Sequence, residues 1–109
     1  MLTFLRRARS RNESEPREPG RLMFHAAPDV KASLHPDGMV LIHHGSGTVF
    51  SSNRVGAMIW KGATERRSLD EVAASISGEF DIPREIVQQD ASKFLAQLEA
   101  EGLLVPDAT

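Results

Sequence analysis

Four histidines are the side chains whose chemistry is most readily put to use, because a neutral imidazole is a common metal ligand. His43 and His44 are adjacent in a run that predicts a strand, so their side chains point to opposite faces and cannot share one ion. His25 and His35 fall in or near predicted loops, without the i, i+4 spacing of a ligand pair on a helix. We therefore expect no metal site and interpret the histidines as solvated or hydrogen-bonded.

The sequence Gly45-Ser46-Gly47 begins like the phosphate-binding turn of a dinucleotide fold. In that fingerprint a third glycine follows three residues later and opens a helix. Here that position is Phe50, and a strand is predicted where the helix should begin. The pattern is typical of a hairpin turn, so we expect no cofactor.

Neighbouring carboxylates at Asp70 and Glu71 could act as acid and base, but their position accounts for them. Ser68 and Glu71 have the spacing of a capping box at the start of a helix. The chain has no cysteine, which excludes Cys nucleophiles, disulfides, thiolate zinc sites and iron–sulfur clusters. Its 109 residues fit one small domain, and so small a core rarely also encloses a water-excluding pocket. We expect no enzyme, although a Ser/His/Asp site assembled by folding stays open as the alternative.

The formal net charge of −2 is the sum of two unequal parts. Residues 1–21 carry six arginines and three glutamates, a net +3, and the remaining residues carry seven basic and twelve acidic side chains, a net −5. Residues 1–21 also hold two prolines and few apolar residues, which predicts a flexible basic arm before a folded domain over 22–109. The arm is either an untethered terminus or an anchor for an acidic partner or membrane, with Leu2, Phe4 and Leu5 as its apolar tip.

The expected compartment is the cytoplasm. The chain has no cysteine, no signal peptide and no run of the roughly 20 apolar residues that span a bilayer. We accordingly expect no stable membrane insertion.

Three short β-prone runs come first in the expected domain. Tight turns at His35-Pro36-Asp37-Gly38 and at Gly45-Ser46-Gly47 separate them and indicate antiparallel neighbours. The sequence therefore predicts a three-stranded meander over Val30–Leu34, Met39–His44 and Thr48–Ser51.

The hydrophobic period then becomes helical, which predicts three helices. The first begins after Asn53, a good N-cap, with Trp60 in the core, and 61–67 is a polar linker. The second follows Ser68, with an apolar stripe of Leu69, Val72, Ala73, Ile76 and Phe80. The third starts near Pro83 and ends at Gly102, a plausible C′ cap. The fold class is α+β, a winged-helix-like domain in which a three-stranded antiparallel meander precedes a three-helix bundle.

The strand Thr48–Ser51 has an outer edge that nothing in its own sequence protects, since it is short and uncharged. Such an edge suits β-augmentation, in which a partner peptide adds a strand. The alternative is an edge covered by Leu22–Pro28 or by a helix.

The same residues resemble the PqqD-like family. The resemblance runs from Val40-Leu41-Ile42 through Val49-Phe50-Ser51-Ser52-Asn53 and Ile59-Trp60 to Phe80-Asp81-Ile82-Pro83 and Gly102-Leu103-Leu104. It implies a domain that binds the leader of a ribosomally made precursor peptide and presents it to a modifying enzyme. That enzyme is typically a radical SAM protein of the quinone-cofactor (PQQ) pathway.

The resemblance also implies where the leader docks, as an extra antiparallel strand in a groove shared with the third helix. Carried over by position, the docking strand is Thr48, Val49, Phe50, Ser51 and Ser52. The helix positions that face it are Asp90, Lys93, Phe94 and Gln97.

Two departures from the family pattern leave other modified-peptide pathways open. Ser52 stands where the family usually has a leucine. The family usually closes the first helix with apolar residues and an Asp-Gly turn, and this chain has Gly62-Ala63-Thr64-Glu65 there instead. The first helix is therefore expected to be shorter or packed differently.

A winged-helix DNA-binding protein is the alternative function. It would require a basic recognition helix, whereas 83–101 carries only Arg84 and Lys93 against four acidic residues. We therefore expect no nucleic-acid partner, and the sequence does not predict an oligomeric state.

Overall fold

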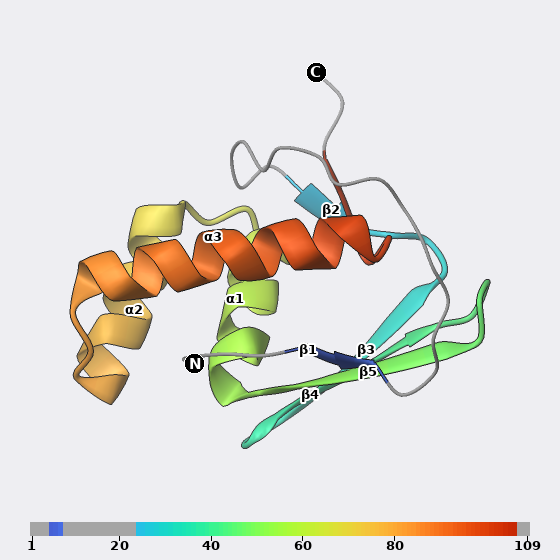
Figure 1. Ribbon diagram of the computed structural model, residues 1–109, viewed down its shortest axis with the longest axis horizontal. Coiled ribbons are helices and arrows are strands. Elements are labelled where there is room, and N and C mark those ends of the chain that lie inside the picture. Colours follow the sequence, from blue (N-terminus) through green and yellow to red (C-terminus); the bar gives the residue numbers. More distant parts are fainter. Residues whose placement is uncertain (1–4, 8–23, 107–109) are drawn as a thin grey trace.

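An antiparallel sheet and three helices packed on one of its faces form the fold (Figure 1). The computed structural model describes residues 5–7 and 24–106, and all structural statements concern those residues. The core lies between the two layers. Its largest fully buried side chains include Met39 and Leu41 from the sheet and Ile59, Ile76 and Leu95 from the helices.

The predicted meander is confirmed. It consists of β3 (Val30–His35), β4 (Gly38–His43) and β5 (Thr48–Asn53), each antiparallel to the next. The turn between β4 and β5 contains Gly47 at φ 72°, a left-handed conformation that glycine adopts without strain. The glycine pair Gly45 and Gly47 therefore belongs to a hairpin turn, as predicted.

Three helices follow: α1 (Arg54–Thr64), α2 (Leu69–Phe80) and α3 (Arg84–Ala100). Asn53 caps α1, because its side-chain oxygen accepts a hydrogen bond of 2.9 Å from the backbone N–H of Gly56. Ser68 and Glu71 form the predicted capping box of α2, with bonds of 3.0 and 3.1 Å. Three strands followed by three helices confirm the predicted α+β, winged-helix-like fold.

Two details of the helices differ from the sequence prediction. α1 extends to Thr64, through the first half of the predicted linker. The small residues Gly62 and Ala63 let it pack closely on α2, and both are buried. Phe80, predicted in the apolar stripe of α2, is 36% exposed; it is the last residue of the helix, whereas the buried residues Val72, Ala73 and Ile76 lie nearer its start and middle.

The end of α3 matches its prediction and adds a feature. Gly102 has φ 77°, and the N–H of Leu103 bonds the carbonyl of Leu98, so the chain turns back as a glycine-terminated helix does. β6 (Leu104–Pro106) then pairs with β2 (Phe24–Ala26) in a separate two-stranded sheet. This small sheet was not predicted.

A fourth strand extends the meander at its β5 edge. β1 (Leu5–Arg7) pairs with β5 in antiparallel orientation, so the sheet order is β1-β5-β4-β3 (Figure 1). β1 comes from the predicted flexible arm and was not predicted as a strand. The arm's boundary at residue 21 lies outside the described residues and stays a prediction.

Candidate functional site

β5 contains every strand residue that the sequence analysis assigned to peptide binding. Its side chains alternate between the two faces of the sheet. Thr48, Phe50 and Ser52 are buried beneath the helices, whereas Val49 is 37% exposed on the opposite face and Ser51 is half-buried there. A strand added at this edge would place alternate side chains toward the core and toward solvent in the same way.

The outer edge of β5 is not free at residues 50–52. Phe24–Ala26, from the segment considered as a cover, pairs with β6 instead. β1 occupies the edge, with Leu5 opposite Ser52, Arg6 opposite Ser51 and Arg7 opposite Phe50. Leu5 is half-buried and packs against the core. The edge therefore accepts an antiparallel strand that carries an apolar, inward-facing side chain.

Ser52, Gly56 and Phe94 meet where β5 runs into α1. A Cβ atom on Gly56 would lie 2.6 Å from Ser52 Oγ and 2.9 Å from the tip of the Phe94 ring. Such distances are too short for a real side chain, so only glycine allows this approach. The structure thus brings together Ser52 and Phe94, two predicted site residues from distant parts of the sequence.

The predicted residues of α3 divide into buried and accessible groups. Phe94 is 2% exposed and belongs to the core. Asp90 is half-buried, and Lys93 and Gln97 are exposed. Spacings of three and four residues place Asp90, Lys93 and Gln97 along one side of the helix. Their contact with a bound peptide stays a prediction.

Two of the described histidines, His35 and His43, have local hydrogen-bonding roles in the two hairpins. His43 Nδ1 accepts a bond of 3.2 Å from the backbone N–H of Ser46, and Ser46 Oγ donates to Thr48 Oγ1 at 2.9 Å. His35 Nε2 lies 2.9 Å from Ser33 Oγ. Among residues 5–7 and 24–106, no three His, Asp or Glu side chains gather as they would to hold a metal ion.

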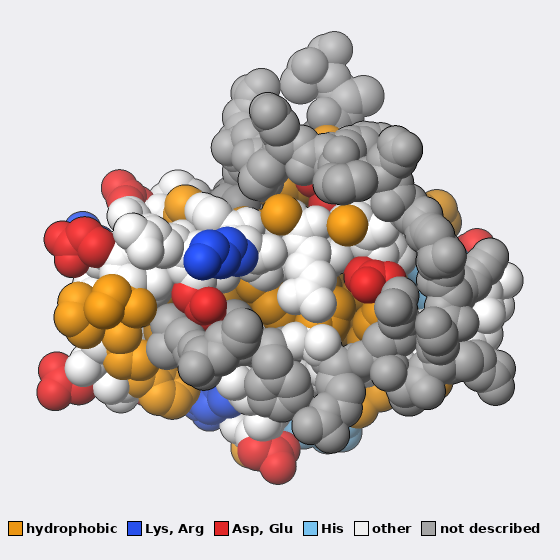
Figure 2. All heavy atoms as spheres, viewed as in Figure 1, with side chains coloured by type: hydrophobic (Ala, Val, Ile, Leu, Met, Phe, Trp, Pro, Cys, Tyr) orange, Lys and Arg blue, Asp and Glu red, His pale blue; other side chains and the backbone are white. Residues whose placement is uncertain are grey.

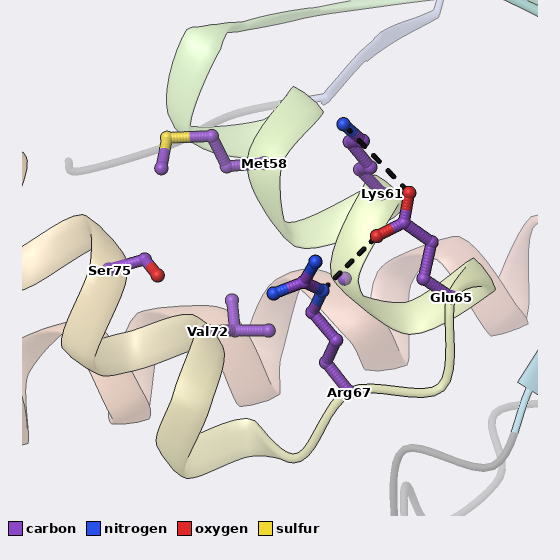
Figure 3. A pocket seen from close by; sticks show the side chains of 7 residues that line it. Met58, Lys61, Glu65, Arg67, Val72 and Ser75 are labelled. Atoms are coloured by element: carbon purple, nitrogen blue, oxygen red, sulfur yellow. Dashed lines mark hydrogen bonds and ion pairs between the residues drawn. The ribbon is translucent and has the colours of Figure 1, made fainter.

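A separate pocket of about 250 Å³ lies between α1 and α2 (Figure 3). Glu65 at its rim pairs with Lys61 at 3.8 Å and with Arg67 at 3.1 Å. The three charged side chains at the rim, Lys61, Glu65 and Arg67, therefore pair with one another. The pocket therefore reflects the packing of two helices, and it is separate from β5.

Sequence reasoning missed Leu5 and Gly56. Leu5 was considered only as part of an apolar tip of the arm, and three residues are too few for a strand periodicity to be recognised. Gly56 follows a helix N-cap by three residues, where a glycine has no local role. Its reason is a close approach of three distant segments, which a single sequence does not reveal.

No helix in the described part of the chain is both long enough and apolar enough to cross a membrane.

The surface seen in Figure 2 carries both polar and hydrophobic side chains, and hydrophobic side chains gather at the end where α2 leads into α3. Phe80 and Ile86, from those two helix ends, are both exposed.

Comparison with known proteins agrees with this geometry. The family described as coenzyme PQQ synthesis protein D (PqqD) matches residues 38–104. No curated protein matches the chain.

Two solved structures have a similar fold. One is a lasso peptide synthetase B1 complexed with the leader peptide, with a TM-score of 0.71 and 24% identity, covering 77% of this chain and 99% of that one. The other is TbiB1 in complex with the TbiA(beta) leader peptide, with a TM-score of 0.68 and 29% identity, covering 78% of this chain and 99% of that one. The family match extends from the start of β4 to the start of β6, which is more than half of the sequence. The chain therefore belongs to the PqqD family, as its resemblance to that family implied.

Proposed function

We propose that this chain is a non-catalytic module that binds the leader of a ribosomally made precursor peptide by strand addition to β5. The observation that carries the proposal is the pairing of β1 with β5. It demonstrates that this edge accepts an extended segment, in antiparallel register over Phe50, Ser51 and Ser52. Both similar structures are complexes with leader peptides, which supports a peptide as the occupant.

The edge explains how such a module would combine affinity with selectivity. Backbone hydrogen bonds along β5 hold any extended peptide, and alternate side chains of the peptide face the core. The position opposite Ser52 suits an apolar side chain, because Leu5 packs against the core there. A leader would therefore carry a leucine-like residue at this register position.

α3 would contribute the second wall of the site. Lys93 and Gln97 are exposed and can donate hydrogen bonds, and Asp90 lies on the same side of the helix. Phe94 would act from beneath, by holding Ser52 and Gly56 in place. Polar contacts from α3 would distinguish among peptides that the backbone of β5 binds equally.

The partner after binding would be the enzyme that modifies the peptide. A radical SAM enzyme of the quinone-cofactor pathway is one candidate, and the departures at Ser52 and at 62–65 leave other modified-peptide pathways open. The chain itself would supply recognition and no bond-making step, since β5 offers backbone groups and apolar contacts.

The test is an NMR titration of the ¹⁵N-labelled full chain with a synthetic leader of the precursor peptide encoded beside its gene. We expect chemical-shift changes at the amides of Thr48–Asn53, because each would gain a neighbouring strand. β3 (Val30–His35), the other edge of the same sheet, is the internal control and should not respond. Changes confined to β3, or no changes at a large excess of leader, would overturn the proposal.

A further inference from the structure

We propose that β1 is a built-in occupant of the peptide-binding edge, which a peptide must displace in order to bind. The inference rests on the proposed function of β5. β1 lies outside residues 38–104, the region that matches the family. Its position alongside β5 is visible in Figure 1.

The two occupants exclude each other for a geometric reason. One edge of a strand has one row of backbone donors and acceptors, and it can pair with one partner strand at a time. β1 uses that row at Phe50, Ser51 and Ser52, which are three of the five strand residues proposed to hold the leader. A leader in the same register would also need the space that Leu5 fills.

β1 is short enough to be displaced. It pairs over three residues and places Leu5 against the core, whereas β3 and β4 pair over six. A peptide that spans all of β5 would pair with Thr48 and Val49 as well, and so gain further backbone bonds. A longer strand with an equivalent apolar residue would therefore win the competition at sufficient concentration.

Covalent connection gives β1 an advantage over a weak peptide. Its local concentration at β5 is fixed by the chain and does not fall on dilution, unlike that of a separate peptide. The apparent Kd of a leader rises by the inverse of the fraction of molecules with an open edge, so an edge open in one molecule of ten raises it about tenfold. β1 would thus exclude short or poorly matched peptides, whose affinity for β5 is too low to displace it.

A reversible cross-link tests the inference in the full chain. Arg6 and Ser51 are directly opposite, and directly opposite Cα atoms in an antiparallel pair lie about 4.5–5.5 Å apart, within the span of a disulfide. The chain has no cysteine, so the double variant Arg6→Cys/Ser51→Cys forms a single defined bond. The reduced form of the same variant is the matched control.

Two probes are titrated by calorimetry into the oxidised and reduced forms: the synthetic leader, and a synthetic peptide with the sequence of residues 1–9. We expect each to bind the oxidised form at least tenfold more weakly than the reduced form. Equal affinity of either probe for the two forms would overturn the inference.

A second pair of variants opens the edge instead of locking it. Leu5→Asp places a charge against the core and should release β1, so that both probes bind up to tenfold more tightly than to the unmodified chain. Leu34→Asp is the control, because Leu34 is 48% exposed on β3 at the far side of the sheet and should leave affinity unchanged. An unchanged or weaker affinity of Leu5→Asp for the peptide of residues 1–9 would contradict the inference.

The two proposals fail in distinguishable ways. If the peptide of residues 1–9 binds Leu5→Asp but the leader binds no form, β1 still occupies the edge and the proposed function is wrong. If the leader binds the reduced form with shifts at β5, and Leu5→Asp leaves its affinity unchanged, the function stands and displacement of β1 is wrong.

Discussion

Leu5 lies directly opposite Ser52 in the β1–β5 pair, and its side chain packs against the core. Directly opposite residues in an antiparallel pair point to the same face of the sheet. Ser52 is small and buried, at a position where a leucine was expected from the family resemblance. The small side chain therefore leaves apolar surface on this face for a residue from the added strand.

Enlarging Ser52 should remove that space. We expect Ser52→Leu to lower the free energy of unfolding by about 1–3 kcal/mol, because the site is already packed against Gly56 and Phe94. Leader affinity should fall as well. Urea unfolding and calorimetry measure the two effects. Ser51→Leu, one residue away on the other face, is the control and should change stability by less than about 0.5 kcal/mol; a similar loss in both variants would contradict the account.

Gly56 should tolerate no side chain. Alanine has a higher helix propensity than glycine. A Cβ at this position, however, would lie 2.6 Å from Ser52 Oγ and 2.9 Å from Phe94 Cζ. We expect Gly56→Ala to destabilise the fold by about 1–3 kcal/mol, because these atoms must move apart. Thermal or urea unfolding provides the measurement.

Gly78 offers the matched control for Gly56. It lies in α2 with no atom within 4 Å of the position of an added Cβ. Gly78→Ala should therefore stabilise the chain by about 0.5–1 kcal/mol through helix propensity alone. A stabilising Gly56→Ala would show that β5, α1 and α3 do not approach as closely as described.

The cap of α1 should matter for stability and little for affinity. Asn53 accepts the backbone N–H of Gly56 through its side chain, so Asn53→Ala should cost about 0.5–2 kcal/mol of folding free energy. Asn53→Asp retains an accepting oxygen and should recover most of the loss. Urea unfolding measures both variants, and a neutral Asn53→Ala would show that the side chain has no capping role.

Hydrogen exchange should separate β1 from the rest of the sheet. A three-residue strand opens locally at a much lower free energy than strands held on both edges, so amides of Leu5–Arg7 should exchange far faster than those of β4. Addition of leader should abolish the remaining protection of β1 and raise that of β5. Equal protection of β1 and β4 in the free chain would contradict a displaceable β1.

The meander and the helices were predictable because local signals agree with the tertiary structure. Turn glycines, the Asn53 cap and the Ser68–Glu71 capping box each specify an element boundary from nearby residues alone. The continuation of α1 to Thr64 was missed because Gly62 and Thr64 have low helix propensity and the segment is largely polar. Gly62 is favoured there because it lies against Val72 of α2, a contact between separate helices.

The candidate site was only partly predictable for a similar reason. The edge of β5 could be identified from strand order, and the predicted strand Thr48–Ser51 covers the first four residues of β5. Its occupant could not be identified, because Leu5 and Ser52 are far apart in the chain and a three-residue strand has no recognisable period. Which residues of α3 complete the site depends on the orientation of a bound peptide.

The central claim is that a leader peptide adds to the sheet at β5, and intermolecular NOEs test it most directly. With labelled full chain and unlabelled leader, the account predicts an antiparallel cross-strand pattern between the backbone of the leader and Thr48–Asn53. It also predicts that NOEs between Leu5 and Ser52 disappear on binding. Leader NOEs to Val30–His35 instead, with the β1–β5 NOEs unchanged at saturation, would contradict it.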